Sequence, residues 1–172
     1  MKLFSVRKSR GFTLIELLIV IALLGALAVG LIGAIDPFEQ LKKGTDTGTR
    51  DIVNQVQTAV IRYYSVKNAF PWTGEVTSET LNGTNMQTAI SNMIGAGELK
   101  SDFTTIHSGN LIKVYVTGSS TTNTVAVCYK PDSKSFQADP NTKYIDATGA
   151  TQDPGSTCKS GTGQQACFWC IK

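Results

Sequence analysis

The feature that most constrains the fold of this chain is an apolar segment near its N-terminus. The nineteen residues from Leu17 to Ile35 carry no charge and almost no polar side chain. As an α-helix they would extend for about 28 Å, which is close to the hydrocarbon thickness of a bilayer. One acid, Glu16, stands at the edge of this segment. Because a carboxylate is costly in lipid, the sequence predicts a membrane-spanning helix in which Glu16 has a partner and a role.

The residues before the apolar segment predict its orientation. Residues 1–11 contain four basic side chains and no acid, and positive charge before a first span holds that end in the cytoplasm. A secretory signal peptide would have a shorter apolar stretch followed by an A-x-A-like cleavage site. Ala26-Leu27-Ala28 lies inside the apolar run instead, so the sequence predicts a single-pass anchor in the cytoplasmic membrane.

The basic leader is followed by the motif Gly11-Phe12-Thr13-Leu14-Ile15-Glu16-Leu17, which contains Glu16. Over about residues 8 to 35 the chain resembles type IV prepilins and type II secretion pseudopilins. The resemblance implies that a membrane-bound prepilin peptidase and methyltransferase cuts between Gly11 and Phe12 and methylates the amine of Phe12. It also implies that Glu16 pairs with the N-terminal amine of a neighbouring subunit when the chain forms a filament.

Electrostatics agrees with this implied pairing. Cleavage would create a cationic amine at Phe12, four positions before Glu16, and two opposite charges in lipid cost less together than apart. Two alternatives stay open. In the membrane-resident monomer Glu16 could extend to the interface, and the whole segment could be an ordinary uncleaved anchor.

Asp36-Pro37 interrupts the helical pattern that follows. Proline lacks the N–H of a helix interior, whereas Asp36 can cap a new helical segment with Pro37 at its first position. In the family that this chain resembles, a proline usually falls where this chain has Gly33. Apolar residues then recur at helical spacing as far as about Lys67, which predicts an amphipathic helix with one face on a globular head. That face contains Ile52, Val53, Val56, Ala59, Val60, Tyr63 and Tyr64.

The remaining sequence predicts one small head. The pattern indicates a polar loop at 73–85 and a short helix from Met86 that ends near Gly95 or Gly97. It also indicates strands at 111–116 and 124–129 and weaker strands at 135–138 and 144–146. The fold class is therefore α+β, with a long N-terminal helix packed on a small antiparallel sheet in the lollipop form of pilins. The expected parts are a leader (1–11), a transmembrane and filament-core helix (12–35), an amphipathic helix (36–67) and the head (68–172).

The charge of the chain excludes one class of partner. The leader holds four of the sixteen basic residues, so the mature side chains carry twelve bases and thirteen acids and a net charge of −1. This balance does not indicate a nucleic-acid-binding surface. No nucleophile–base pair, phosphate loop or pair of catalytic carboxylates is evident, so we expect no enzymatic activity and no cofactor.

Four cysteines lie in the part expected outside the membrane, at Cys128, Cys158, Cys167 and Cys170. An even count in an oxidising compartment predicts two disulfides. Three pairings are open, although a bond between Cys167 and Cys170 would not hold the tail to distant residues. A zinc site is the alternative, since Cys167-x-x-Cys170 is half of a four-cysteine site. The family resemblance implies a disulfide that fastens the C-terminal segment.

A few further residues could form sites in the head. Asp139, Asp146 and Asp153 carry oxygens that could bind calcium, as in some pseudopilins, but their spacing matches no compact calcium loop and turn formation explains them better. His107 is the single histidine and is expected in a loop. Phe168 and Trp169 could form an adhesive patch, although packing beside the cysteines is the expectation.

These expectations combine into one function and two alternatives. The chain is expected to be a homopolymeric type IV pilus subunit for adhesion, twitching motility or DNA uptake. It would move from the inner membrane to an extracellular pilus with the help of the peptidase and the assembly machinery. The first alternative is a pseudopilin of type II secretion, in a periplasmic pseudopilus. The second is a monomeric membrane-anchored binding domain, for example a redox or zinc module.

Overall fold

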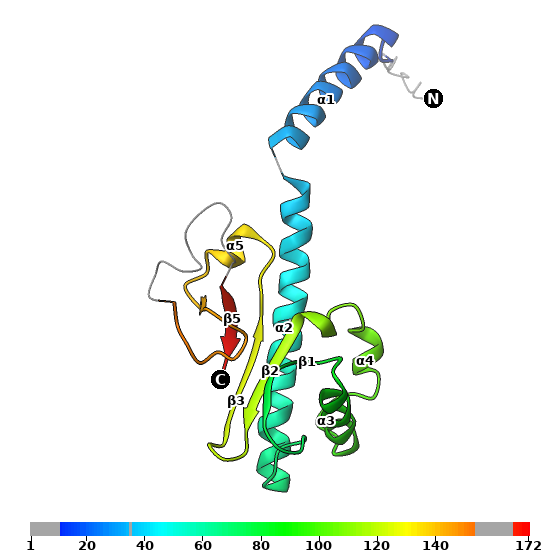
Figure 1. Ribbon diagram of the computed structural model, residues 1–172. Coiled ribbons are helices and arrows are strands. Elements are labelled where there is room, and N and C mark those ends of the chain that lie inside the picture. The colour runs from blue at the N-terminus through cyan, green and yellow to red at the C-terminus, as the bar shows by residue number, and fades with distance from the viewer. Residues whose placement is uncertain (1–10, 35, 154–166) are drawn as a thin grey trace, which may run out of the picture. The chain divides into compact units, whose positions relative to one another are not determined.

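The computed structural model describes residues 11–34, 36–153 and 167–172 (Figure 1). The chain divides into two compact units, Met1–Phe38 and Glu39–Lys172, which are described separately. Their helices and one antiparallel sheet give the α+β fold class that the sequence predicts.

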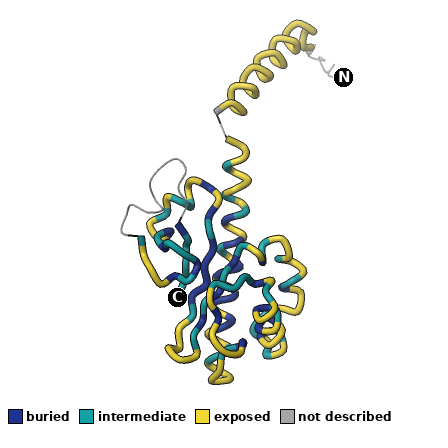
Figure 2. Tube along the Cα trace, in the orientation of Figure 1, coloured by how far each residue is buried: buried dark blue, intermediate teal, exposed yellow. Residues whose placement is uncertain are grey.

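The N-terminal unit contains one long apolar helix, α1, from Leu14 to Ala34. Within it, Leu14–Gly33 is long and apolar enough to cross a membrane, and no part of this stretch is buried. Figure 2 shows its trace in the colour of exposed residues. A helix that is apolar on every side needs lipid or other helices around it.

The helix break predicted at Asp36-Pro37 is confirmed. Helix α1 ends at Ala34, and α2 runs from Pro37 to Lys67. The backbone N–H of Phe38 donates to Asp36 Oδ1 at 3.1 Å, so Asp36 caps the new helix. At its other end Asn68 takes a positive φ of 52°, the left-handed conformation with which helices commonly finish.

The head is built on a five-stranded antiparallel sheet in the order β1-β2-β3-β5-β4. Its strands are β1 (Val76–Thr80), β2 (Val114–Ser119), β3 (Thr124–Tyr129), β4 (Thr142–Tyr144) and β5 (Phe168–Ile171). The predicted strand 124–129 is β3 with the same bounds, whereas β2 begins later than predicted, because residues 111–113 form a short 3-10 turn. The prediction of a loop at 73–85 was wrong for residues 76–80, which form β1.

Helix α2 supplies one wall of the hydrophobic core, as predicted. Ile52, Val53 and Val56 are almost completely buried and belong to one cluster with residues of the sheet and of two further helices. These helices are α3 (Thr84–Gly95), close to the predicted helix, and the short α4 (Phe103–Ile106), which was not predicted. Figure 2 shows buried residues concentrated on α2 and the neighbouring strands.

The weak strand predicted at 135–138 was wrong, because this segment is the helix α5, Lys134–Gln137. Ser133 precedes it as N-cap, and its Oγ accepts a hydrogen bond from the Phe136 N–H at 3.4 Å. The local capping residue therefore outweighs a β-rich pattern of four residues. The strand predicted at 144–146 lies two residues earlier, as β4, because Asp146 accepts hydrogen bonds from Thr148 in a turn.

Carboxylates of α2 hold the connection between β3 and β4. Asp46, only 2% exposed, accepts hydrogen bonds from the backbone N–H groups of Asp132 and Ser133 and from the Ser133 hydroxyl, at 2.6 to 3.0 Å. About two helical turns earlier, Glu39 accepts a hydrogen bond from the Lys134 N–H at 2.5 Å. Together Asp46 and Glu39 fix the start of α5 to α2.

Arg50 makes a second contact between α2 and the same connection. Its guanidinium carbon lies 4.6 Å from the ring centre of Phe136 and 4.5 Å from that of Trp169. Its Nη2 bonds Asp139 Oδ2 at 2.7 Å. Close by, burial raises the pKa of Tyr129 to about 12, although Arg50 favours the phenolate. Tyr129 therefore remains neutral beside the cation at physiological pH.

Because of the Arg50–Asp139 pair, we expect the free energy of unfolding to fall in acid. The hydrogen bond from Arg50, assisted by the Asn141 backbone N–H, holds the pKa of Asp139 below its usual value. The pair therefore stabilises the fold above the ordinary aspartate pKa, near 4, and this contribution disappears as the pH falls below that range. For a partly exposed pair we expect about 1 kcal/mol or less.

Chemical denaturation at pH 7 and pH 3 measures this contribution against Asp139→Asn. The other carboxylates titrate in both proteins, so the difference between the two free energies of unfolding isolates residue 139. We expect the difference to be present at pH 7 and to shrink at pH 3. A difference that stays constant would show that the Asp139 charge does not contribute.

Gly118 marks a place where the sheet leaves no room for a side chain. A Cβ at this position in β2 would lie 2.1 Å from Cζ2 of Trp72, whose side chain is 6% exposed. We expect Gly118→Ala to lower the free energy of unfolding by about 1–3 kcal/mol through overpacking. Denaturation followed by tryptophan fluorescence measures this loss. Gly48→Ala is the control, because nothing lies within 4 Å of that Cβ in α2, and it should be neutral or slightly stabilising.

Candidate processing and assembly site

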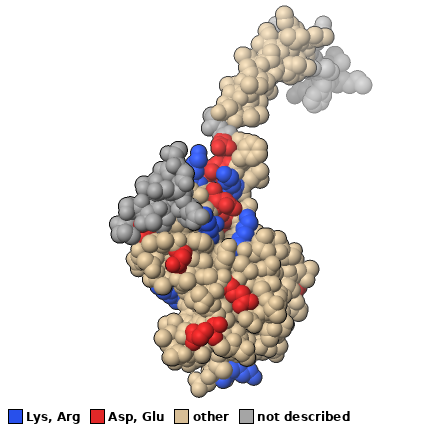
Figure 3. All heavy atoms as spheres, viewed as in Figure 1, with Lys and Arg blue, Asp and Glu red and all other residues tan. Residues whose placement is uncertain are grey.

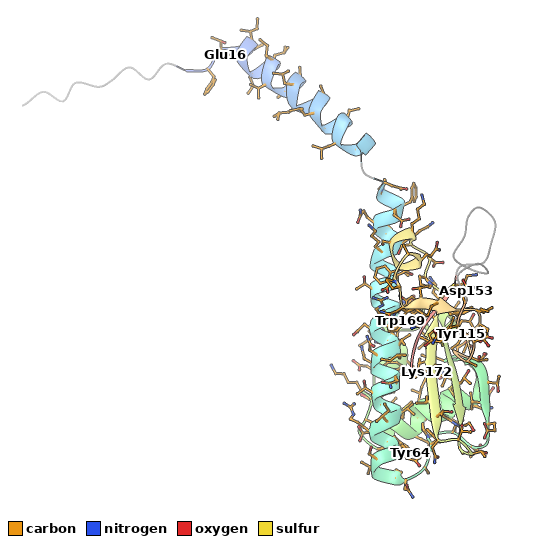
Figure 4. The ribbon with its side chains drawn as sticks, turned by 90° about the vertical axis from the view of Figure 1, so that its left-hand side faces the viewer. Glu16, Tyr64, Tyr115, Asp153, Trp169 and Lys172 are labelled. Atoms are coloured by element: carbon orange, nitrogen blue, oxygen red, sulfur yellow. A yellow bond between two sulfur atoms is a disulfide. The ribbon has the colours of Figure 1, made fainter. Side chains whose placement is uncertain are left out.

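Thr13 and Glu16 close the first turn of α1 with reciprocal hydrogen bonds. The Thr13 backbone N–H and hydroxyl each donate to Glu16 Oε2 at 2.8 Å, and the Glu16 N–H donates to Thr13 Oγ1 at 3.3 Å. This is a capping box, in which two residues three positions apart satisfy N–H groups that a helix start leaves free. Glu16, labelled in Figure 4, therefore has a partner within its own chain.

The capping box was not predicted, although its signal is present in the sequence. Thr13-Leu14-Ile15-Glu16 has the Thr-x-x-Glu spacing directly before an apolar run. The box engages Oε2, and no described residue donates to Oε1. The carboxylate thus keeps Oε1 for another donor. For Oε2, a cation would compete with the two hydrogen bonds from Thr13.

Gly11 and Phe12 lie immediately before the helix, in a segment without regular secondary structure. Phe12 is 91% exposed, and a Cβ at Gly11 would meet nothing within 4 Å. The peptide bond between them is therefore open to an enzyme that approaches the start of α1. Because this chain has room for a side chain at position 11, a requirement for glycine there would come from the peptidase.

The cysteines of the head include one disulfide between distant segments. Cys128 of β3 bonds Cys170 of β5, across 42 positions of sequence. Cys167 is disulfide-bonded as well, and Cys158 lies outside the described residues. A bond between Cys167 and Cys170 is thereby excluded, in agreement with the expectation. The disulfide also removes two of the four thiolates that the alternative zinc site needs.

The disulfide lies on the face of the sheet that the turn after β4 covers. A Cβ at Gly149 would lie 3.3 Å from Cys170 Sγ and 3.4 Å from Cys128 Sγ, and Gly149 has a φ of +66°. Cys128 is completely buried. Glycine thus gives this turn both its left-handed conformation and its close approach to the sulfur atoms.

The three aspartates that could bind calcium make other contacts in the structure. Asp139 pairs with Arg50, and Asp146 accepts hydrogen bonds from Thr148 in a turn. Asp153 donates its backbone N–H to the Lys143 carbonyl oxygen at 2.6 Å. Within the described ranges, no three His, Cys, Asp or Glu side chains come together as a metal site.

The two C-terminal aromatic residues are packed rather than displayed. Phe168 meets the ring of Tyr115 edge to face, with centroids 5.8 Å apart. Trp169 lies against Tyr129, with centroids 5.7 Å apart, and against Arg50 of α2 (Figure 4). Both side chains are half-buried, which is the packing that the sequence predicts in place of an adhesive patch.

His107 follows α4 and packs edge to face on Phe103, with centroids 4.9 Å apart. It lines an open groove of about 450 Å³ between α2 and the segment from Glu98 to His107. An ion pair between Arg62 and Glu98, at 2.7 Å, borders this groove. Asp102 and Glu98 line the groove together with His107.

Comparison with known families adds one finding. Residues 6–32 match the model of the family described as the prokaryotic N-terminal methylation motif. This is the leader signature of type IV pilins and pseudopilins, and it includes Gly11, Phe12 and the capping box. The resemblance noted in the sequence is therefore confirmed for this segment. No curated protein and no solved structure matches the chain.

Proposed function

We propose that this chain is a structural subunit of a type IV pilus. The precursor spans the inner membrane once through α1, with its leader in the cytoplasm. A prepilin peptidase removes the leader between Gly11 and Phe12 and methylates the new amine. The subunit then polymerises through α1, and its heads form the outer surface of the filament.

One observation carries this proposal: the leader motif stands at the start of a helix that is long and apolar enough to cross a membrane. None of the apolar stretch Leu14–Gly33 is buried, and the motif match spans residues 6–32. A membrane covers such a helix in the precursor, and helices of other subunits cover it in a filament. The same surface thus serves both states, and moving from one to the other needs no refolding of the head.

In this proposal Glu16 changes its partner during assembly. In the membrane, Thr13 satisfies the carboxylate through the capping box. When the subunit joins the filament, the methylated amine of Phe12 on a neighbour supplies a cation, and a paired charge is tolerated in an apolar core where a single one is not. The pairing sets the axial register of helices that are otherwise uniformly apolar.

The proposed role is structural, without enzymatic activity of this chain. Cleavage, methylation and movement are the work of the peptidase and of the assembly machinery. The filament would serve adhesion, twitching motility or DNA uptake. The disulfide that fastens β5 to β3 fits this proposal, because the family resemblance implies a disulfide at the C-terminal segment.

Mass spectrometry of the protein from its native membrane tests the proposal. We expect a chain that begins at Phe12 and carries one methyl group on the N-terminal amine. A Gly11→Val variant is the control, because a peptidase that recognises the glycine should leave it uncut. An intact Met1 in the wild-type protein would contradict the proposal and favour a membrane-anchored monomer.

Fractionation separates the pilus from the secretion pseudopilus. We expect the mature chain to be abundant in fibres sheared from the cell surface. A processed, methylated chain that stays in the periplasm and is needed for protein secretion would instead identify a pseudopilin.

A further inference from the structure

Four lysines gather at the end of the head where α2 begins. Lys42 and Lys43 lie near the start of α2, Lys130 follows β3, and Lys134 begins α5. Their elements meet there because Glu39 and Asp46 of α2 bind the backbone N–H groups of residues 132–134. In Figure 3, basic atoms appear along the first turns of α2, with acidic atoms between them. We call Lys42, Lys43, Lys130 and Lys134 the basic collar.

The acids at this end are engaged within the protein. Asp46 accepts three hydrogen bonds from the segment before α5. Asp139 is paired with Arg50 at 2.7 Å, and Asp132 with Lys113 at 3.3 Å. Glu39 accepts the Lys134 N–H, and Asp36 caps α2. These carboxylates therefore point their oxygens at donors of the same chain.

The lysines of the collar have no such engagement. Among the described residues none of the four makes an ion pair, since the three ion pairs there involve Arg50, Arg62 and Lys113. Lys42 and Lys134 are exposed, and Lys43 and Lys130 are half-buried. The collar thus presents ammonium groups that remain available to an anion outside the protein.

The position of the collar along the chain limits what that anion can be. Helix α2 begins three residues after α1 ends, and Lys42 follows Pro37 by about 7.5 Å of helix. The headgroup layer of a bilayer is roughly 5–7 Å thick on each side. Beside the lysines, Leu41 is 69% exposed. Lysines and an apolar side chain directly after a span are typical of residues at the membrane interface.

We propose that the basic collar binds the phosphate groups of anionic lipids in the outer leaflet of the membrane that α1 spans. The mature chain has a net side-chain charge of −1, so the attraction is local to this end and does not extend over the head. The contact orients the head on the membrane surface before assembly. This inference rests on the membrane-resident precursor of the proposed function.

Amine labelling of the full chain in lipid nanodiscs tests the proposal. One set of nanodiscs contains phosphatidylcholine alone, and the other contains phosphatidylcholine with phosphatidylglycerol. We expect the labelling rates of the collar lysines to fall several-fold in the anionic nanodiscs. Lys67 lies at the other end of α2, about 38 Å from Lys42 along that helix. It is the internal control and should label equally in both. High salt should restore labelling of the collar, because it screens exposed charges.

A charge variant gives an independent measurement. We compare K42Q/K43Q/K130Q/K134Q with the matched variant K67Q/K100Q/K143Q/K172Q, which removes the same number of charges elsewhere. Native mass spectrometry counts the phosphatidylglycerol molecules that each protein retains. We expect the collar variant to lose most of them and the control variant to keep them.

Three outcomes would overturn the inference. The first is equal labelling of the collar lysines in both kinds of nanodisc. The second is equal retention of phosphatidylglycerol by both variants. The third is protection of the collar that rises with protein concentration in detergent, which would indicate contact with a second copy of the chain. A chain that does not insert into nanodiscs would contradict the proposed function as well. Insertion with an unprotected collar would contradict this inference alone.

Discussion

Replacing Glu16 with glutamine is expected to stop filament formation while leaving leader cleavage intact. Glutamine at this position still forms a capping box with Thr13, so the start of α1 is preserved. It has no charge to offer the amine of a neighbouring subunit, and that amine would be left unpaired among apolar helices. A loss of only about 1.4 kcal/mol per added subunit lowers the binding constant tenfold, so we expect at least about a tenfold loss of sheared fibres.

Two Thr13 variants separate the charge from the cap. Thr13→Ser keeps the hydroxyl and should assemble like the wild type. Thr13→Val removes the side-chain cap, at a cost of about 1 kcal/mol, but leaves the carboxylate free for the amine, so its defect should be smaller than that of Glu16→Gln. Normal assembly by Glu16→Gln would show that capping is the whole role of this residue.

Removing the disulfide should be the largest single loss of stability in the head. Cys128 and Cys170 close a loop across 42 positions, and the loss of such a crosslink lowers the free energy of unfolding by about 4 kcal/mol in the chain-entropy model. Cys128→Ala, Cys170→Ala and the double variant are compared by chemical denaturation. Because either substitution removes the same bond, each single variant should lose about as much as the double variant. Losses that add together would indicate separate packing contributions instead.

Local signals in the sequence predicted the three long helices well, but not the four-residue helices α4 and α5. Asp36-Pro37 marked the start of α2, and the apolar spacing from Ile52 to Tyr63 marked its buried face, because both depend on residues within a few turns of one another. The strand β3 was equally clear, since Thr124–Tyr129 is rich in β-branched and aromatic residues next to a polar turn.

Features that depend on distant partners were missed. Asp46 and Arg50 look like ordinary surface charges of an amphipathic helix, and only residues some 86 to 89 positions later give them their roles. Likewise β5 reads as a short cysteine-rich tail, and it becomes a strand because β3 and β4 pair with it on either side. The strand β1 carries four polar residues and a bulge, so its pattern resembles a loop.

The candidate site was predicted in its residues but not in its geometry. Gly11, Phe12 and Glu16 were identified by their spacing, and the family comparison covers all three. The hydrogen bonds between Thr13 and Glu16 were not predicted, because the cost of a carboxylate in lipid indicates a charged partner and not a neutral hydroxyl. The nearest donor was three residues away in the same chain.

The place of β5 in the sheet has a consequence for the order of folding. The hairpin of β2 and β3 can form as soon as both strands have been synthesised, because a short turn joins them. Strand β4 gains its place only when Phe168–Ile171 arrive and insert between it and β3. This step joins residues far apart in sequence and is therefore slow. Oxidation of Cys128 with Cys170 then makes the insertion permanent, so a head that carries this bond has completed its sheet.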